Sequence, residues 1–303
     1  MSAYLPGVVT IPNPLEIPYS LNMYINAWLQ YITGIICLVA ILAVINSIAS
    51  RGNVEGINMF NLNRMAGTVW VGRPLLVLRG VAAICLLSTS SLELVQNGKA
   101  SMFVTKTLPW YQAVLASGEV GWIIYVYNDM MTIFTSQYTY HTALASSLLM
   151  WLIAALFAFL SPVSHSASVS RDCFAVEMDF DINCLSGVVA IGSVRRFWLM
   201  LIIAAVCTIL CFLVFRLTYR NLKLPISRSL LLSSTARYVY ELNGWVYDEI
   251  YHLDRMSAVL NGLIVFSRNS VFYALDIKSW RFVMIPVSTT CPKKFEDSLP
   301  LTQ

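Results

Sequence analysis

Three unbroken apolar runs of membrane-span length constrain this chain more than any other feature. They cover residues 27–49, 142–160 and 197–215, and arginines bracket the last run closely on both sides. A helix needs about 20 apolar residues to cross the hydrocarbon core of a bilayer. The sequence therefore predicts that the chain is embedded in a membrane by helices in at least these three places.

The overall composition supports a membrane location. Hydrophobic residues make up 57% of the chain and charged residues only 12%, whereas soluble domains carry roughly a quarter of their residues as charges. Disorder requires the opposite balance, low hydrophobicity and high charge. The formal net charge of +4 is too small to indicate a nucleic-acid partner. We expect the lipid bilayer as the main partner and no nucleic acid.

Two further apolar runs are interrupted by charges. Residues 75–94 contain Arg79 and Glu93 near their ends, where long side chains can reach the headgroup region. Residues 108–134 are long enough to cross but include Glu119 and Asp129. We interpret the second run as a span or a re-entrant segment, which gives about five spans in total and leaves four or six open.

The distribution of Lys and Arg predicts the orientation, because loops rich in these residues stay on the cytoplasmic side. The loop after the first span and the segment after the last are both rich in arginine, which predicts an external N-terminal arm, residues 1–26, and a cytoplasmic C-terminus. Because no Lys or Arg precedes Arg51, we do not expect an N-terminal signal peptide. Four basic residues would then be external and argue against this orientation: Lys99, Lys106, Arg195 and Arg196.

The predicted bundle covers residues 27–217 and contains one polar loop, and a second polar segment follows the bundle. The loop 161–196 is acidic in part and would be external. Residues 218–303 read as a small cytoplasmic module. Residues 245–260 have apolar side chains at helical spacing, and Gly262 is a suitable C-terminal stop. The β-branched and aromatic runs that follow, up to Pro286, predict a short antiparallel meander. The expected fold class is mainly α, a transmembrane bundle with an α+β module.

Glu119 lies inside a predicted span, and its carboxylate can have any of three roles there. A carboxylate inside a span costs about 2.5 to 3.5 kcal/mol on insertion scales. It can be a structural group paired with Arg79 or Lys106, a residue at a misplaced span boundary, or an ion or proton site. We expect structural pairing most. Asp129, at the end of the same apolar run, has the pattern of an ordinary interface residue.

Seven cysteines are present, and two of them lie in the proposed external loop. Cys173 and Cys184 could form a disulfide there, because oxidising compartments permit bridges; both the bridged and the free form stay open. The three histidines are scattered, and the chain has no phosphate-binding, dinucleotide-binding or zinc-protease motif. We therefore expect no cofactor, no metal site and no enzymatic activity.

Several short phrases resemble a set of multi-pass membrane proteins of oomycete type. They include Val71-Gly72-Arg73-Pro74-Leu75, Gly118-Glu119-Val120-Gly121-Trp122 and the tail phrase Leu275-Asp276-Ile277-Lys278-Ser279-Trp280-Arg281. The resemblance implies a polytopic membrane protein, in the plasma membrane or an endomembrane, and brings no activity, ligand or site residue. It also implies that the chain is short for the set.

Two functional hypotheses follow. The first is a non-enzymatic membrane protein whose cytoplasmic module binds a protein partner or regulates the bundle. The alternative is a transporter or channel that uses Glu119. Discontinuous helices are common in transporters, and glycines on both sides of Glu119 are a faint version of that pattern.

Overall fold

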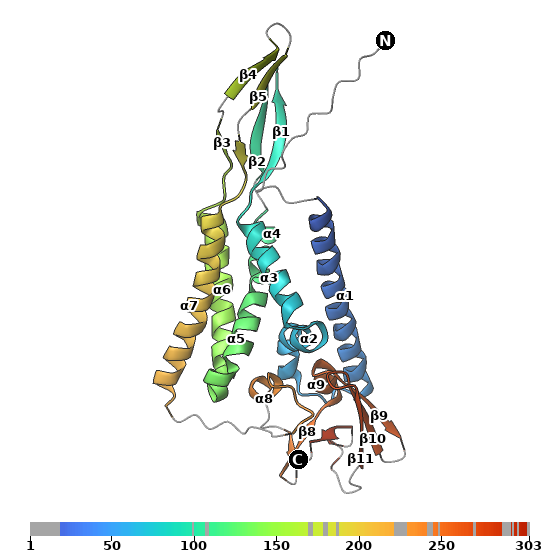
Figure 1. Cartoon of the computed structure of the whole chain (residues 1–303). Helices are drawn as coiled ribbons and strands as arrows, with labels where there is room; N and C mark the ends of the chain where they lie inside the picture. Colours follow the sequence, from blue (N-terminus) through green and yellow to red (C-terminus); the bar gives the residue numbers. More distant parts are fainter. Residues whose placement is uncertain are drawn as a thin grey trace, which may run out of the picture.

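The computed structural model is mostly helical and has strands at both ends of a helical bundle (Figure 1). The structure describes residues 19–98, 100–106, 109–168, 172–177, 181–185, 188–220, 229–240, 245–247, 249–268, 271–286, 292, 294–295 and 297–301. The N-terminal arm up to residue 18 and Cys291 lie outside the described residues, and the predicted turn at Arg268-Asn269 lies partly outside them.

The bundle consists of helices that run alongside one another in Figure 1. Its helices are α1 (Tyr19–Ala49), α3 (Arg73–Leu87), α4 (Trp110–Glu119), α5 (Gly121–Thr135), α6 (Thr139–Leu160) and α7 (Val194–Thr218). Three short elements connect α1 to α3: η1 (Gly56–Asn61), α2 (Leu62–Ala66) and the π-helical η2 (Gly67–Val71). The turn η3 (Ser136–Tyr138) joins α5 to α6.

Three helical stretches are long and apolar enough to cross a membrane, by length and composition. They are Met23–Ala49, Trp110–Leu160 and Val194–Thr218. The second stretch covers 51 residues, and it folds back on itself at η3, so that α4 and α5 pack against α6. These stretches contain all three of the clear apolar runs, and they support the prediction of a membrane protein.

The outward faces of the helices are apolar. Large hydrophobic side chains such as Ile41 on α1, Leu148 on α6 and Ile202 on α7 are exposed. Water-soluble monomers rarely expose such continuous apolar surface. The helices therefore present a surface suited to lipid, while side chains from α3, α5, α6 and α7, including Ile84, Ile124 and Met150, form the core between them.

The predicted helix over residues 75–94 ends earlier than expected. Helix α3 stops at Leu87, and Glu93 and Leu94 lie in strand β1 (Ser91–Asn97), which pairs with β2 (Ala100–Lys106) in register Glu93↔Val104. The Ser88-Thr89-Ser90 sequence explains the stop, since hydroxyl side chains compete for backbone partners. The Thr89 hydroxyl donates to the Cys85 carbonyl oxygen at 3.0 Å.

Strands project beyond one end of the bundle, which we call the hairpin end (Figure 1). Besides β1 and β2, they are β3 (Ser166–Ser168), β4 (Asp172–Glu177), β5 (Asp181–Leu185) and β6 (Val188–Ala190). They form two-stranded pairs: β1 with β2, β3 with β6, and β4 with β5. The described part of the predicted polar loop 161–196 thus holds the short strands β3 to β6, and α7 begins inside the predicted bounds, at Val194.

The opposite end of the bundle, the module end, carries the C-terminal module of residues 229–301. Its elements are α8 (Ala236–Val239), β7 (Val246–Tyr247), β8 (Ile250–Leu253), α9 (Arg255–Leu260), β9 (Leu263–Arg268), β10 (Val271–Asp276), β11 (Arg281–Pro286) and β12 (Leu299–Pro300). The antiparallel sheet β11-β10-β9 confirms the predicted meander, and β12-β8-β7 forms a second sheet.

The helix predicted over residues 245–260 is wrong in its first part. Among the described residues of this stretch, only Arg255–Leu260 is helical, and the strands β7 and β8 precede it as an antiparallel pair. The His252 amide donates to the Trp245 carbonyl oxygen at 2.8 Å, and Glu249 turns the chain with a φ of 60°. Asp254 then caps α9 by accepting from the Ser257 amide at 3.1 Å. Spacing suggested one helix, but aromatic and β-branched residues favour the strands.

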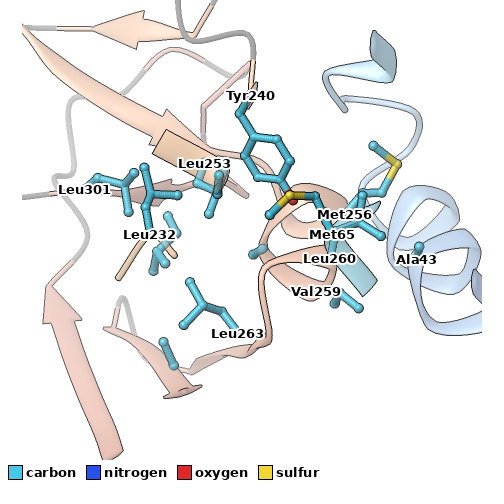
Figure 2. Close-up of a cluster of buried hydrophobic side chains, with 14 of the residues drawn as sticks. Ala43, Met65, Leu232, Tyr240, Leu253, Met256, Val259, Leu260, Leu263 and Leu301 are labelled. Atoms are coloured by element: carbon cyan, nitrogen blue, oxygen red, sulfur yellow. The ribbon is translucent and has the colours of Figure 1, made fainter. Parts of the chain in front are cut away.

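The module and the bundle share one hydrophobic core. Val39 and Ala43 of α1 and Met65 of α2 are fully buried in the same cluster as Leu260 and Phe272 of the module. Figure 2 shows Met256, Val259 and Leu260 beside Ala43 and Met65. Because a shared core resists separation, the module is a fixed part of the molecule rather than a tethered domain.

Candidate functional site

An ion pair lies in the middle of the bundle. The Arg79 guanidinium on α3 donates from Nε to Glu119 Oε2 at 2.7 Å and from its second terminal nitrogen to Oε1 at 3.0 Å. This two-point geometry is the strongest form of an arginine–carboxylate contact. The structure thus pairs Glu119 with Arg79, one of the two partners that the sequence allowed. Lys106 pairs instead with Glu93 at the hairpin end.

Two more side chains complete this site. The Trp122 indole donates to Glu119 Oε2 at 2.8 Å, and the Arg79 guanidinium lies 5.0 Å from the centre of a Trp122 ring. Arg79 also donates to the Thr33 hydroxyl at 2.8 Å. Residues from α1, α3, α4 and α5 therefore meet at one point, which we call the mid-bundle cluster: Thr33, Arg79, Glu119 and Trp122.

The local sequence explains how α3 comes so close to α5. A Cβ at Gly80 would lie 2.5 Å from Ile123 Cγ1 and 2.9 Å from the Ile123 backbone nitrogen. Only glycine permits this approach, and it brings the neighbouring Arg79 within reach of Glu119. Helix α4 ends at Glu119 and α5 begins at Gly121, so that Glu119 and Trp122, three residues apart, both reach Arg79.

A cavity of about 350 Å³ opens beside the cluster. Arg79, Glu119 and Thr33 form its polar wall, together with Gln30. The rest of its lining is apolar: Leu29 of α1, Ala82, Ala83 and Leu86 of α3, and Ala116 of α4. Alanines leave this space because their side chains are too short to fill the gap between the three helices. The cavity has the size and the mostly apolar lining that are typical of small-molecule sites.

A second polar site lies at the module end, around Asp129. The Asp129 side chain is 1% exposed, which overturns the expectation of an ordinary interface residue. It pairs with Arg73 at the start of α3 and accepts a hydrogen bond from the Thr235 hydroxyl of the module. One carboxylate therefore joins the bundle and the module. We call these three residues the junction site.

Arg64 on α2 is a buried cation near the junction site. Burial lowers the pKa of Arg64 to about 10, although Tyr125 and Asp129 act in the opposite direction. Its guanidinium lies 6.0 Å from the centre of the Tyr125 ring. Its Nε and one terminal nitrogen find no hydrogen-bond partner among the described residues. In the sequence, Arg64 and Arg73 are only two of the arginines in the loop after the first span. Nothing in the pattern marks Arg64 as buried or Arg73 as the partner of Asp129.

Further polar contacts fix the module to the loop between α1 and α3. The Asn58 amide donates to the Ser257 hydroxyl at 3.0 Å, and the Trp70 indole donates to the Val259 carbonyl oxygen at 3.0 Å. Tyr251 donates to Glu55 at 3.2 Å. Burial is the main reason that the pKa of Tyr251 is raised, with Glu55 second. These partners are far apart in sequence, so no local pattern could have identified them.

Cys173 and Cys184 lie opposite each other in the β4–β5 pair. Opposite Cα atoms of antiparallel strands are about 4.5–5.5 Å apart, within the range that a disulfide spans. The backbone register is thus compatible with the predicted bridge, which stays a prediction. Cys37, Cys85, Cys207 and Cys211 are free thiols in the helices.

Among the described residues, no group of three or more His, Cys, Asp or Glu could hold a metal ion. Comparisons with protein-family models, with curated proteins and with solved structures find no match. The resemblance to oomycete-type membrane proteins therefore stays a prediction.

Proposed function

We propose that this chain is a five-span, non-enzymatic integral membrane protein whose C-terminal module is a cytoplasmic partner-binding element fixed to the bundle. Helices α1, α3, α4–α5, α6 and α7 would be the spans, with the hairpin end outside. The shared core and the junction site support a fixed module, because a partner that binds it would act directly on the helix ends.

The observation that carries the partner-binding proposal is the outer face of the sheet β11-β10-β9. Phe272 and Ala274 of β10 point into the core, whereas Phe266, Phe282 and Met284 on the neighbouring strands are 60%, 57% and 67% exposed. This outer sheet face gathers three exposed apolar side chains on adjacent strands of the module, whereas other exposed apolar residues of the module, such as Leu230 and Trp280, lie outside its strands. Exposed patches of this kind mark interaction sites.

Charge at the edge of the face indicates the chemistry of the partner. Arg268 ends β9 on the same face as Phe266 and is exposed. Arg281 begins β11 and is also exposed, but it alternates to the opposite face from Phe282. Aromatic residues, Met and Arg are the residue types enriched at protein interfaces. The proposed partner is therefore a cytoplasmic protein with an apolar centre and an acidic rim.

The test compares two charge insertions on equally large side chains. Phe266→Asp places a carboxylate on the outer sheet face, and Phe60→Asp places one on η1 at a residue that is 91% exposed. We expect quantitative cross-linking in intact cells to lose one partner with Phe266→Asp and to retain it with Phe60→Asp. Identical cross-linking profiles for the two variants and the natural chain would overturn the partner-binding proposal.

The topology is tested separately by labelling from each side of the membrane. We expect Cys173 and Cys184 on the outside, bridged to each other, and Cys291 on the cytoplasmic side. Labelling of Cys184 and Cys291 from the same side would overturn the five-span arrangement. Free thiols at both Cys173 and Cys184 under non-reducing conditions would count against the bridge and the orientation.

The transporter alternative is supported by one observation, the cavity that reaches Glu119. The hydrogen bonds from Arg79 and Trp122 weigh against it, because they engage both carboxylate oxygens. An ion or proton site needs a carboxylate that can exchange partners. Flux into liposomes, compared between the natural chain and Glu119→Gln, decides this point. Equal background flux for both removes the alternative.

A further inference from the structure

The cavity beside the mid-bundle cluster combines a polar wall with an apolar lining. From it we propose that the cavity binds a sterol-like lipid, a compact apolar molecule with a single hydroxyl group. This inference rests on the proposed five-span arrangement, which gives the cavity its depth in the bilayer.

The position of the cavity favours a ligand that enters from the lipid phase. The predicted span begins at residue 108, so Trp110, the first residue of α4, lies near its outer edge. Glu119 follows Trp110 by nine residues, a rise of about 14 Å along a helix, which is close to half of a hydrocarbon core of about 30 Å. Leu86 at the cavity and Leu115 beside Ala116 are 66% and 69% exposed. The surface around the cavity is therefore apolar and faces the bilayer rather than water.

The charge of the wall requires a neutral ligand. Arg79 and Glu119 neutralise each other, so a charged head group beside them would have no counter-charge. Burying such a group in the membrane is costly, and this excludes phosphate-bearing lipids. A hydroxyl group is the polar head that can be buried at the lowest cost, provided that it finds a hydrogen-bond partner.

Two atoms in the wall can bond such a hydroxyl group. The Glu119 side chain is 42% exposed, and Oε1 accepts one hydrogen bond among the described residues, whereas Oε2 accepts two. Oε1 can therefore accept a further bond from a hydroxyl donor. The Gln30 side chain is exposed one turn from Thr33 on α1 and offers both a donor and an acceptor.

The shape of the cavity favours a rigid body over an acyl chain. It is bounded by three helices and extends along α3 only from Arg79 to Leu86, about 10 Å at the helical rise. An extended acyl chain needs a long, narrow channel and loses rotamer freedom when it is confined. A fused-ring body fits a space of this short length without this loss.

The test uses the purified full chain in lipid nanodiscs and a photoactivatable cholesterol as the probe. We expect saturable labelling that maps by mass spectrometry to residues 29–33, 82–86 and 116–119. Unlabelled cholesterol should compete. Its methyl ether, which cannot donate a hydrogen bond, should compete about tenfold less well, the value of one hydrogen bond.

Two matched variants locate the site. Ala82→Leu fills the cavity at a residue that lies outside the buried core clusters, and Ala205→Leu adds the same bulk to α7, away from the cavity. We expect Ala82→Leu to abolish saturable labelling and Ala205→Leu to preserve it, with both variants melting near the natural chain. If Ala82→Leu fails to fold, Ala116→Val provides a smaller filling.

Three results would overturn the proposal. They are non-saturable labelling spread over the outside of the bundle, equal competition by cholesterol and its methyl ether, and equal competition by a monoacylglycerol. The labelling experiment does not depend on the cysteine accessibility experiment. If the cysteines report a different topology but labelling is saturable, the five-span arrangement alone is wrong. If the cysteines report the expected topology but labelling is not saturable, the sterol site alone is wrong.

Discussion

The two ends of the bundle are built in different ways. At the hairpin end, six strands pair two by two, and the long β1–β2 ribbon is exposed along most of its length. At the module end, α1 and α2 share a buried core with the module, and Asp129 joins the bundle to it. One end can vary without disturbing the helices, whereas the other holds the helix ends in fixed positions.

Deletion of each end gives the largest expected difference. Removal of residues 229–303 exposes Val39, Ala43, Met65 and Ala66, which are fully buried. We expect a loss of more than about 4 kcal/mol of stability from these side chains alone, measured as aggregation or as a lower melting temperature in detergent. Replacement of residues 91–106 by a short glycine linker should leave the melting temperature nearly unchanged. Similar losses for both deletions would contradict the comparison.

Glu119→Gln tests the region between the two ends. Without the carboxylate, Arg79 is an unpaired cation near the middle of a span. We expect a loss of about 3 kcal/mol and reduced expression. Arg79→Met combined with Glu119→Leu should recover most of this loss, since an apolar pair can replace a buried ion pair. Unchanged expression and thermal stability in Glu119→Gln would disprove the structural role of the pair.

How far the sequence predicts this architecture depends on how local each interaction is. The apolar runs and the β9–β11 meander depend on neighbouring residues, and the pattern identifies both. The end of α3 at Leu87 and the β7–β8 hairpin depend on competition between helix and strand, where tertiary packing decides. The partners of Asp129 are 56 and 106 residues away, and a single sequence carries no signal for such distances.

Asp129→Asn is the sharper test of the module end. The variant weakens the contacts to Arg73 and Thr235 and removes the charge that favours the buried Arg64. We expect the free energy of unfolding to fall by about 2 kcal/mol and the module to be cleaved faster. Limited proteolysis measures the rate of cleavage. Asp297→Asn is the matched control. Asp297 is 47% exposed in its pair with Arg255, so its loss should cost less than about 1 kcal/mol. Equal proteolysis of both variants would contradict a special role for the junction site.

The smallest expected effect is a pH dependence of the module end. Burial lowers the pKa of His252 below its ordinary value of 6.5, and its ring contacts the Ser298 hydroxyl at 3.1 Å beside β12. The unfolded chain therefore takes up a proton at a higher pH than the folded chain does. Stability should fall as the pH drops through 6.5 towards the lowered pKa, and it should be fully present above 6.5.

Asp254 acts in the opposite direction. Burial raises the pKa of Asp254 above 3.8, so the folded module binds this proton more tightly than the unfolded chain. Stability from Asp254 therefore increases as the pH falls from the raised pKa to 3.8. Variants isolate the His252 contribution, with melting temperatures measured between pH 5 and pH 8. His252→Gln should remove the loss near pH 6, whereas replacement of His165, a half-buried histidine at the hairpin end that contacts the Thr105 hydroxyl, should leave it unchanged. If His165→Gln instead removes the fall in melting temperature near pH 6, the acid-sensitive region is the hairpin end rather than the module end.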